Sequence, residues 1–174
     1  CHLVNLLIYL LYHIIKMKKI IIYTDGAAKG NPGNGGYGIV MKYGSYRKEF
    51  SEGFRKTTNN RMELLAVIIA LENIKRKCPV EVYSDSKYVV DSITKGWVFG
   101  WEKKAFKGKK NKDLWSRYLQ VHKNFDIKFF WVKGHANNIE NERCDELAVK
   151  AAEGLGPNGG SLSIDNGFES GMFN

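Results

Sequence analysis

The sequence predicts an α/β fold in which a mixed β-sheet carries helices on its faces. Three observations lead to this prediction. Apolar, β-branched runs alternate with turn-rich segments early in the chain, later segments place apolar residues three or four positions apart, and three strands precede alternating helices and strands. The chain has 174 residues, enough for one domain with its own hydrophobic core.

The first three elements are predicted to be strands of an antiparallel meander. Residues 19–24 form an apolar run, residues 36–43 alternate in polarity, and residues 46–54 follow a short Gly44-Ser45 turn. Residues 28–35 are dense in Gly, Asn and Pro, so we expect a loop between the first two strands.

Helices and short strands follow the meander. The segment 60–77 has Leu64, Val67 and Leu71 on one face, and Pro79 lies just past its end as a stop signal. Further helices are predicted at 86–94, 114–122 and 142–152, and short strands at 80–84 and 127–132.

The two ends of the chain differ from this central region. Within residues 1–16, Leu3 to Ile15 is nearly all apolar, but this stretch of about 13 residues is shorter than the ~20 that span a bilayer. Because Met17 looks like a natural start, we interpret 1–16 as an extension that is non-native or disordered, with a membrane-lying helix as the alternative. Residues 154–174 contain six Gly, three Ser and three Asn without apolar periodicity, which predicts a disordered tail.

Four carboxylates stand at the edges of apolar elements. Asp25 ends a β-branched run, where a buried charge is costly unless a cation meets it. Hard oxygen ligands of this kind favour Mg²⁺, with Mn²⁺ as a substitute. The other carboxylates are Glu63, Asp85 and Asp145.

Each carboxylate also has a simpler explanation. Asp25-Gly26 could be a turn, and Glu63 could cap a helix that starts near Asn60. Asp85 could be a helix cap, and Asp145 could interact with a helix dipole. Spacing in the sequence leaves both explanations open.

Several motifs resemble type I ribonuclease H in order and spacing, over about residues 18–153. They are DG at 25–26 with GNPG at 30–33, TTNNRME at 57–63, SDS at 84–86, WVKGHA at 131–136 and ENERCD at 140–145. The resemblance implies a catalytic domain at 17–153 with a five-stranded mixed sheet of order 3-2-1-4-5 and helices on both faces.

The resemblance also implies an activity, which is hydrolysis of the RNA strand of RNA–DNA hybrids by two metal ions, giving 5′-phosphate and 3′-hydroxyl ends. Asp25, Glu63, Asp85 and Asp145 then correspond to the metal-binding carboxylates, and His135 to a mobile catalytic histidine. A catalytically inactive hybrid-binding module is the alternative, which the presence of all four carboxylates disfavours.

A basic and aromatic segment points to a nucleic-acid partner. The formal net charge of the chain is +9, and residues 95–112 hold seven Lys and one Glu, hence +6 of that charge. By resemblance this basic segment grips the DNA strand, with Trp97 against a deoxyribose. Predicted substrate contacts are Asn31, Thr58, Asn59, Asn60, Ser86, Trp97, Trp101, Lys103 and Lys104.

One position departs from the family pattern. Thr58 and Ser86 match two members of a pocket for a DNA phosphate, and the third, usually Asn, aligns with Gly100. We therefore expect that pocket to lack one side-chain hydrogen bond.

The remaining expectations concern the setting of the protein. An odd number of cysteines, Cys1, Cys78 and Cys144, without a CxxC motif indicates free thiols in a reducing compartment, and we expect the cytoplasm. We also expect a monomer that needs no small-molecule cofactor and no membrane.

Overall fold

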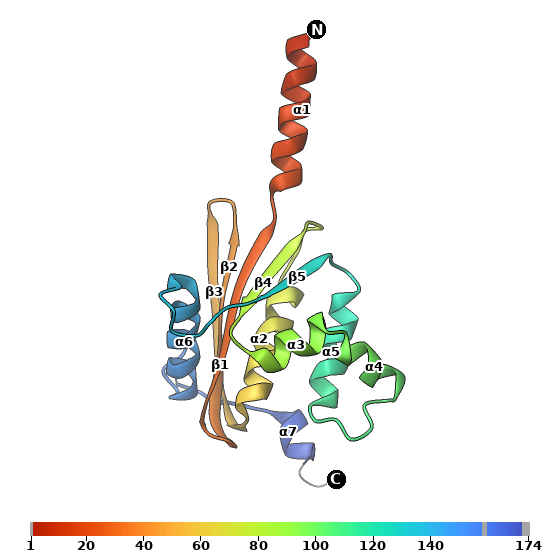
Figure 1. The fold of residues 1–174 in the computed structure, drawn as a ribbon. Coiled ribbons are helices and arrows are strands. Elements are labelled where there is room, and N and C mark those ends of the chain that lie inside the picture. The colour runs from red at the N-terminus through yellow and green to blue at the C-terminus, as the bar shows by residue number, and fades with distance from the viewer. Residues whose placement is uncertain (1, 158–159, 172–174) are drawn as a thin grey trace.

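A six-stranded mixed sheet organises the chain (Figure 1). The computed structural model describes residues 2–157 and 160–171. The strands are β1 (Ile20–Gly30), β2 (Gly33–Tyr43), β3 (Tyr46–Thr57), β4 (Val80–Ser84), β5 (Ile127–Trp131) and β6 (Ser163–Ile164). Their order in the sheet is β5-β4-β1-β2-β3-β6. The predicted order of five strands is confirmed, and β6 adds a sixth at the β3 edge.

β1 and β2 form a longer hairpin than the sequence predicted. The antiparallel register runs from Ile21 opposite Lys42 to Gly30 opposite Gly33, so most of the predicted loop 28–35 lies within the ladder. Backbone hydrogen bonds do not require apolar side chains, and the end of the hairpin is exposed, so polar residues and glycines are tolerated there. On the other side, β4 pairs with β1 in parallel, with Thr24 opposite Ser84.

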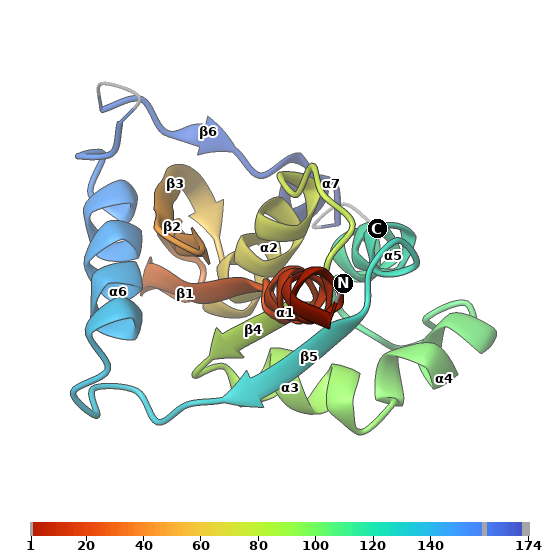
Figure 2. The same cartoon turned by 90° about the horizontal axis from the view of Figure 1, so that it is seen from above.

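The helices cover both faces of the sheet (Figures 1 and 2). α6 packs on β1 and β2 from one side, and α2 packs on β1 and β2 from the other, with α5 behind it. Besides α1 and α7, described below, the helices are α2 (Asn59–Glu72), α3 (Lys87–Thr94), α4 (Trp97–Lys103), α5 (Lys112–His122) and α6 (Ile139–Ala152).

α2 ends earlier than the predicted 60–77, at Glu72. The side-chain amide of Asn73 donates to the Ile69 carbonyl at 2.8 Å and closes the last turn. α6 begins three residues before the predicted start, because the side chain of Asn138 caps it by accepting from the Asn141 amide.

The main hydrophobic core lies between the sheet and α2. The side chains of Ile22, Ile39 and Val82 on the strands are fully buried, as are Leu64 and Leu71 on α2. α2 is buried almost all round, so its position relative to β1 is fixed by packing on several sides.

The prediction of a disordered tail is wrong for part of the C-terminal segment. β6 pairs in parallel with β3, and α7 (Asn166–Gly171) follows beside α2 and α5 (Figure 2). Asp165 between them is buried and forms an ion pair with Arg61. Composition could not reveal this because strand pairing and the polar bonds of buried Asp165, rather than an apolar period, anchor the segment.

α1 (His2–Met17) projects away from the rest of the molecule (Figure 1). Its large apolar side chains between Leu3 and Ile14 are exposed, from 48% for Leu10 to 83% for Leu3. Residues 2–17 are thus helical where the sequence analysis allowed disorder. Among the described residues, no helix combines the length and hydropathy needed to cross a membrane.

Candidate active site

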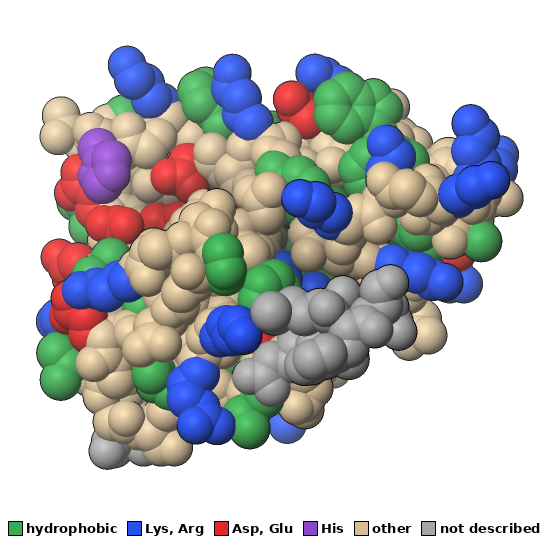
Figure 3. Space-filling view, turned by 90° about the horizontal axis from the view of Figure 1, so that it is seen from below, with side chains coloured by type: hydrophobic (Ala, Val, Ile, Leu, Met, Phe, Trp, Pro, Cys, Tyr) green, Lys and Arg blue, Asp and Glu red, His purple; other side chains and the backbone are tan. Residues whose placement is uncertain are grey.

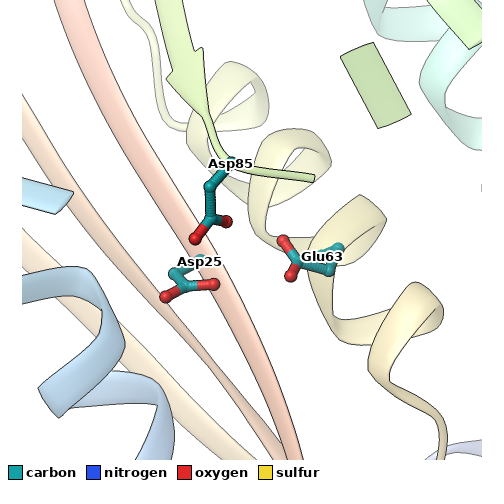
Figure 4. A group of neighbouring side chains, drawn as sticks. All are labelled: Asp25, Glu63 and Asp85. Carbon is teal, nitrogen blue, oxygen red and sulfur yellow. The ribbon is translucent and has the colours of Figure 1, made fainter. Parts of the chain in front are cut away.

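Three of the predicted carboxylates converge at the carboxyl end of β4. Asp25 comes from β1, Glu63 from the first turns of α2, and Asp85 from the residue that follows β4, and their side chains point toward one another (Figure 4). One oxygen of each lies within 4.8 Å of the others. Asp25 and Glu63 are each 5% exposed.

Close backbone packing brings Glu63 to Asp25. A Cβ atom on Gly26 would collide with the backbone nitrogen of Glu63 and would lie 2.7 Å from the Met62 carbonyl carbon. Only a residue without a side chain allows the start of α2 to approach β1 this closely. The glycine after Asp25 is therefore a packing requirement here, whereas the sequence also allowed it to be a turn residue.

Asp145 lies near the three carboxylates but outside the group within 4.8 Å. It is half-buried on α6, one residue after Cys144, whose thiol donates to the Tyr23 carbonyl on β1. Its negative charge contributes to the raised pKa of Asp25 and of Asp85. The structure thus places Asp145 at the border of the cluster.

The cluster is electrostatically strained when no cation is present. Burial, followed by the charge of Asp85, raises the pKa of Asp25 to about 8. Burial also raises the pKa of Glu63, followed by the charge of Asp25. The pKa of Asp85 is raised as well, mainly by burial, and a hydrogen bond from Asn141 opposes this shift. Like charges in a buried site cannot all ionise without a neutralising partner.

The donor set fits a hard divalent cation. Asn59 donates to Oε1 of Glu63 at 3.4 Å, whereas Oε2 of Glu63 is buried and has no hydrogen-bond partner among the described residues. A buried carboxylate oxygen without a donor is costly, and a cation satisfies it. Three carboxylates without His or Cys are the ligands that Mg²⁺ and Mn²⁺ prefer.

The loop after β5 carries His135 beside the cluster. The Val132 amide donates to the Ser84 carbonyl at 3.0 Å, and Trp131 Nε1 donates to the Asp85 carbonyl at 3.0 Å. A side chain at Gly134 would lie 2.7 Å from Asp85 Oδ2, so the loop passes directly over this carboxylate. His135 is the next residue, exposed and with φ of 55°.

An open groove of about 820 Å³ lies between the start of α2 and the start of α5. We call it the α2/α5 groove. Of the predicted substrate contacts, Asn31, Thr58 and Asn60 line it, and the Asn59 amide donates to Asn31 Oδ1 at 3.2 Å beside it. The other lining residues are Pro32, Arg61, Lys109, Lys110, Asn111, Lys112, Asp113, Ser116, Gly167 and Phe168.

The α2/α5 groove separates Gly100 from the predicted phosphate contact Thr58. Asn111 shares the groove with Thr58, whereas Gly100 lines a different pocket and has no atom within 4 Å of an added Cβ. Asn111, eleven positions after Gly100, is therefore a second candidate for the third member of the expected phosphate pocket. The sequence feature that could have indicated Asn111 is an Asn within a Lys-rich turn, because Asn tolerates the left-handed backbone conformation. The φ angle of Asn111 is 62°. Ser86 caps α3, is buried, and does not line the groove.

The second pocket, which we call the α4 pocket, combines aromatic and basic side chains. It measures about 500 Å³, and Trp97, Trp101 and Lys104 line it with Gly96, Gly100, Lys107 and Lys109. Lys95 Nζ lies 5.1 Å from the Trp97 ring centroid, and Lys109 Nζ lies 5.1 Å from that of Trp101. Lys103 is exposed at the end of α4, outside this pocket.

The fold and this site together define a class, that of mixed α/β enzymes with a carboxylate cluster suited to divalent cations. Comparisons with known proteins identify the family. The sequence profile described as RNase H matches residues 17–153. A protein named Ribonuclease H from Rippkaea orientalis is 53% identical over 141 residues, covering 78% of this chain and 86% of that protein.

Solved structures agree with the sequence comparison. LC9-RNase H1, described as a type 1 RNase H with the type 2 active-site motif, superposes with a TM-score of 0.72 at 28% identity, covering 90% of this chain and 82% of that one. LC11-RNase H1 in complex with an RNA/DNA hybrid superposes with a TM-score of 0.57 at 27% identity, covering 77% and 96%. The chain belongs to the RNase H family, and it is a nuclease of the hydrolase class.

Proposed function

We propose that this protein is an endoribonuclease that hydrolyses the RNA strand of RNA–DNA hybrids and leaves 5′-phosphate and 3′-hydroxyl ends. The convergence of Asp25, Glu63 and Asp85 within 4.8 Å carries the proposal. The relative LC11-RNase H1, recorded with a bound RNA/DNA hybrid, supports the substrate class.

Asp25, Glu63, Asp85 and Asp145 would hold two Mg²⁺ ions, with Mn²⁺ as a substitute. When bound, such ions activate a water as the nucleophile and neutralise charge on the leaving 3′ oxygen. Asp25 and Glu63, both buried, would fix the positions of the ligand oxygens, and the half-buried Asp145 would complete the site from α6.

His135 would act in proton movement or product release. Its loop is tied to β4 at Ser84 and Asp85, while the imidazole itself is exposed. An exposed imidazole beside the reacting phosphate can exchange a proton with solvent and with an oxygen of the product.

The two pockets would bind the DNA strand of the hybrid. In the α2/α5 groove, Thr58 and Asn111 would donate to a DNA phosphate, with nearby Lys side chains offsetting its charge. In the α4 pocket, Trp97 and Trp101 would contact deoxyribose, with Lys103 and Lys104 beside them.

Recognition of RNA needs a contact to the 2′-hydroxyl. Asn31 and Asn60 line the α2/α5 groove and Asn59 bonds to both Asn31 and Glu63, so these three residues would supply that contact. Figure 3 shows Lys and Arg side chains spread over the face opposite α1, with acidic side chains gathered in one part of it. Such a face suits a polyanion that must reach an acidic centre.

The test is cleavage of an end-labelled RNA–DNA hybrid in Mg²⁺ by the wild-type protein and by Asp25→Asn. We expect wild-type cleavage within the RNA strand and a loss of at least about 100-fold in the variant. Duplex DNA of the same sequence is the control. Equal cleavage by both proteins, or none by the wild type, would contradict the proposal.

A further inference from the structure

A buried carboxylate from outside the family match binds Arg61, a residue that lines the α2/α5 groove. Asp165 lies twelve residues beyond the matched region 17–153 and is 8% exposed. Its Oδ2 accepts from Arg61 Nε at 2.7 Å and its Oδ1 from Arg61 Nη2 at 2.8 Å. Oδ2 also accepts from Thr57 Oγ1 at 2.6 Å. The C-terminal segment is thus bonded to the residues on both sides of Thr58–Asn60.

Arg61 itself has no donor left for a phosphate. Besides its two bonds to Asp165, Nη1 donates to Asp113 at 2.9 Å and to Asn111 Oδ1 at 3.3 Å, and Nη2 donates to Asp113 at 2.6 Å. These bonds use all five N–H donors of a guanidinium. Although Arg61 lines the groove, it can act on a ligand only through the groups that it holds.

The group held in this way is the amide of Asn111. Because Arg61 only donates, it selects the oxygen of the Asn111 amide, and the nitrogen must face the other way. Nδ2 donates one hydrogen to Tyr88 Oη at 3.0 Å, and no described residue accepts the second. Asn111 lines the groove, so this second N–H is available to a phosphate oxygen there.

We propose that the segment 160–168 is part of the DNA-phosphate site, with Asp165 as a positioning residue that acts through Arg61 on Asn111. This inference rests on the proposed function. Without the charge of Asp165, Arg61 regains free donors and is no longer held on two sides. Its guanidinium can then turn away from Asn111, and the amide loses the bond that sets its orientation.

The coupling between docking of the segment 160–168 and binding of the hybrid must be reciprocal. If docking of the segment favours binding of the hybrid, the hybrid must favour docking of the segment by the same factor. Amides of the docked segment report this directly. The Phe168 amide, for example, donates to the Asp165 carbonyl at 3.0 Å within the turn that starts α7.

The first experiment compares Asp165→Asn with a matched control, Glu72→Gln. Glu72 also binds an arginine, Arg117, through two bonds of 2.7 and 2.6 Å, but it lies at the far end of α2 and does not line the groove. Dissociation constants for the hybrid are measured in chelator, and KM and kcat in Mg²⁺, well below the unfolding temperature of each variant.

We expect Asp165→Asn to raise the dissociation constant and KM about 5-fold with kcat little changed, and Glu72→Gln to change neither. In the background of Asn111→Asp, Asp165→Asn should have no further effect on the dissociation constant. If Asp165→Asn only lowers the unfolding temperature, or if its effect persists in that background, the inference is overturned while hybrid cleavage by the wild type keeps the proposed function intact.

A second measurement needs no variant. Amide hydrogen exchange of the wild-type protein at residues 164–168 should slow by about 5-fold when the hybrid is bound in chelator. Unchanged exchange there, with binding shown by protection elsewhere, would overturn the inference even if Asp165→Asn failed to fold.

Discussion

Asp25 and Gly38 lie directly opposite each other in the antiparallel ladder of β1 and β2. A Cβ atom on Gly38 would collide with the Cys144 carbonyl of α6 and lie 2.8 Å from the Leu147 side chain. The absence of a side chain opposite Asp25 therefore lets α6 approach the sheet and bring Asp145 toward the cluster. One backbone pairing thus links a carboxylate to the position of a helix on the opposite face from α2.

Replacement of Gly38 by Ala should move α6 and weaken both stability and activity. The methyl group meets a backbone carbonyl, which cannot yield as a flexible side chain could, so we expect a loss of about 1–3 kcal/mol in the free energy of unfolding. Chemical denaturation measures it. Gly100→Ala, where a Cβ meets open space, is the control, and an equal effect of both variants would contradict the packing argument.

The stability of the metal-free protein should fall as pH rises from about 4 to about 8. Burial and then the charge of Asp85 raise the pKa of Asp25 from its ordinary 3.8 to about 8. Between these values the folded protein holds a proton that the unfolded chain releases, so the free energy of unfolding decreases with pH. Thermal unfolding in chelator at several pH values measures the trend.

Asp25→Asn separates this effect from general acid or base sensitivity. The variant removes one charge, so we expect a flatter pH dependence and a higher unfolding temperature than the wild type at pH 8 without metal. Mg²⁺ should stabilise the wild type and have a much smaller effect on the variant. A wild type whose stability rises over the same pH range would show that the cluster is not strained.

Substitutions can show whether Asn111 or Gly100 contributes to binding of the DNA phosphate. Asn111→Asp keeps an oxygen for Arg61 and tolerates the left-handed backbone, but it puts a carboxylate where an N–H would meet phosphate. We expect KM for the hybrid to rise about 10-fold or more. Gly100→Ala should leave KM unchanged and, being in α4, should stabilise slightly. A higher KM in Gly100→Ala with an unchanged KM in Asn111→Asp would instead show that Gly100 belongs to the phosphate pocket.

The basic segment should determine the salt dependence of binding. Replacing Lys103, Lys104, Lys107, Lys109 and Lys110 by Gln removes five charges around the two pockets. We expect weaker hybrid binding and a shallower slope of log affinity against log salt, by up to about one unit for each phosphate that a lysine no longer neutralises. Replacing five other lysines, at 18, 48, 75, 123 and 150, controls for net charge. Equal slopes in both variants would contradict a local role.

A chain that begins at Met17 should fold and act like the full sequence. The large apolar side chains of α1 between Leu3 and Ile14 are exposed, and α1 extends away from the sheet (Figure 1). We expect an unchanged unfolding temperature and unchanged kcat and KM, with less self-association because the apolar surface is gone. A shorter chain that is inactive or unfolded would show that α1 contributes to the domain.

Periodicity predicted the elements well where side chains alone decide them. The β-branched run before Asp25 and the apolar face of Leu64, Val67 and Leu71 needed no knowledge of the rest of the chain. The predicted boundaries were wrong where backbone pairing or a single polar bond decides the end of an element. Examples are the extension of β1 to Gly30 and the end of α2 at Glu72.

The candidate site also has features that a local sequence pattern reveals and features that it does not. The available carboxylates could be named from the sequence, because a charged residue at the edge of an apolar element is visible in a local pattern. Three-dimensional packing was needed to show that Asp25, Glu63 and Asp85 meet while Asp145 stays at the border. It was also needed to show that Asn111 and not Gly100 shares a groove with Thr58, and that Asp165 binds Arg61. These relationships depend on close backbone approaches and on bonds between distant segments, such as that of Arg61 with Asp165, 104 residues later, which no local pattern encodes.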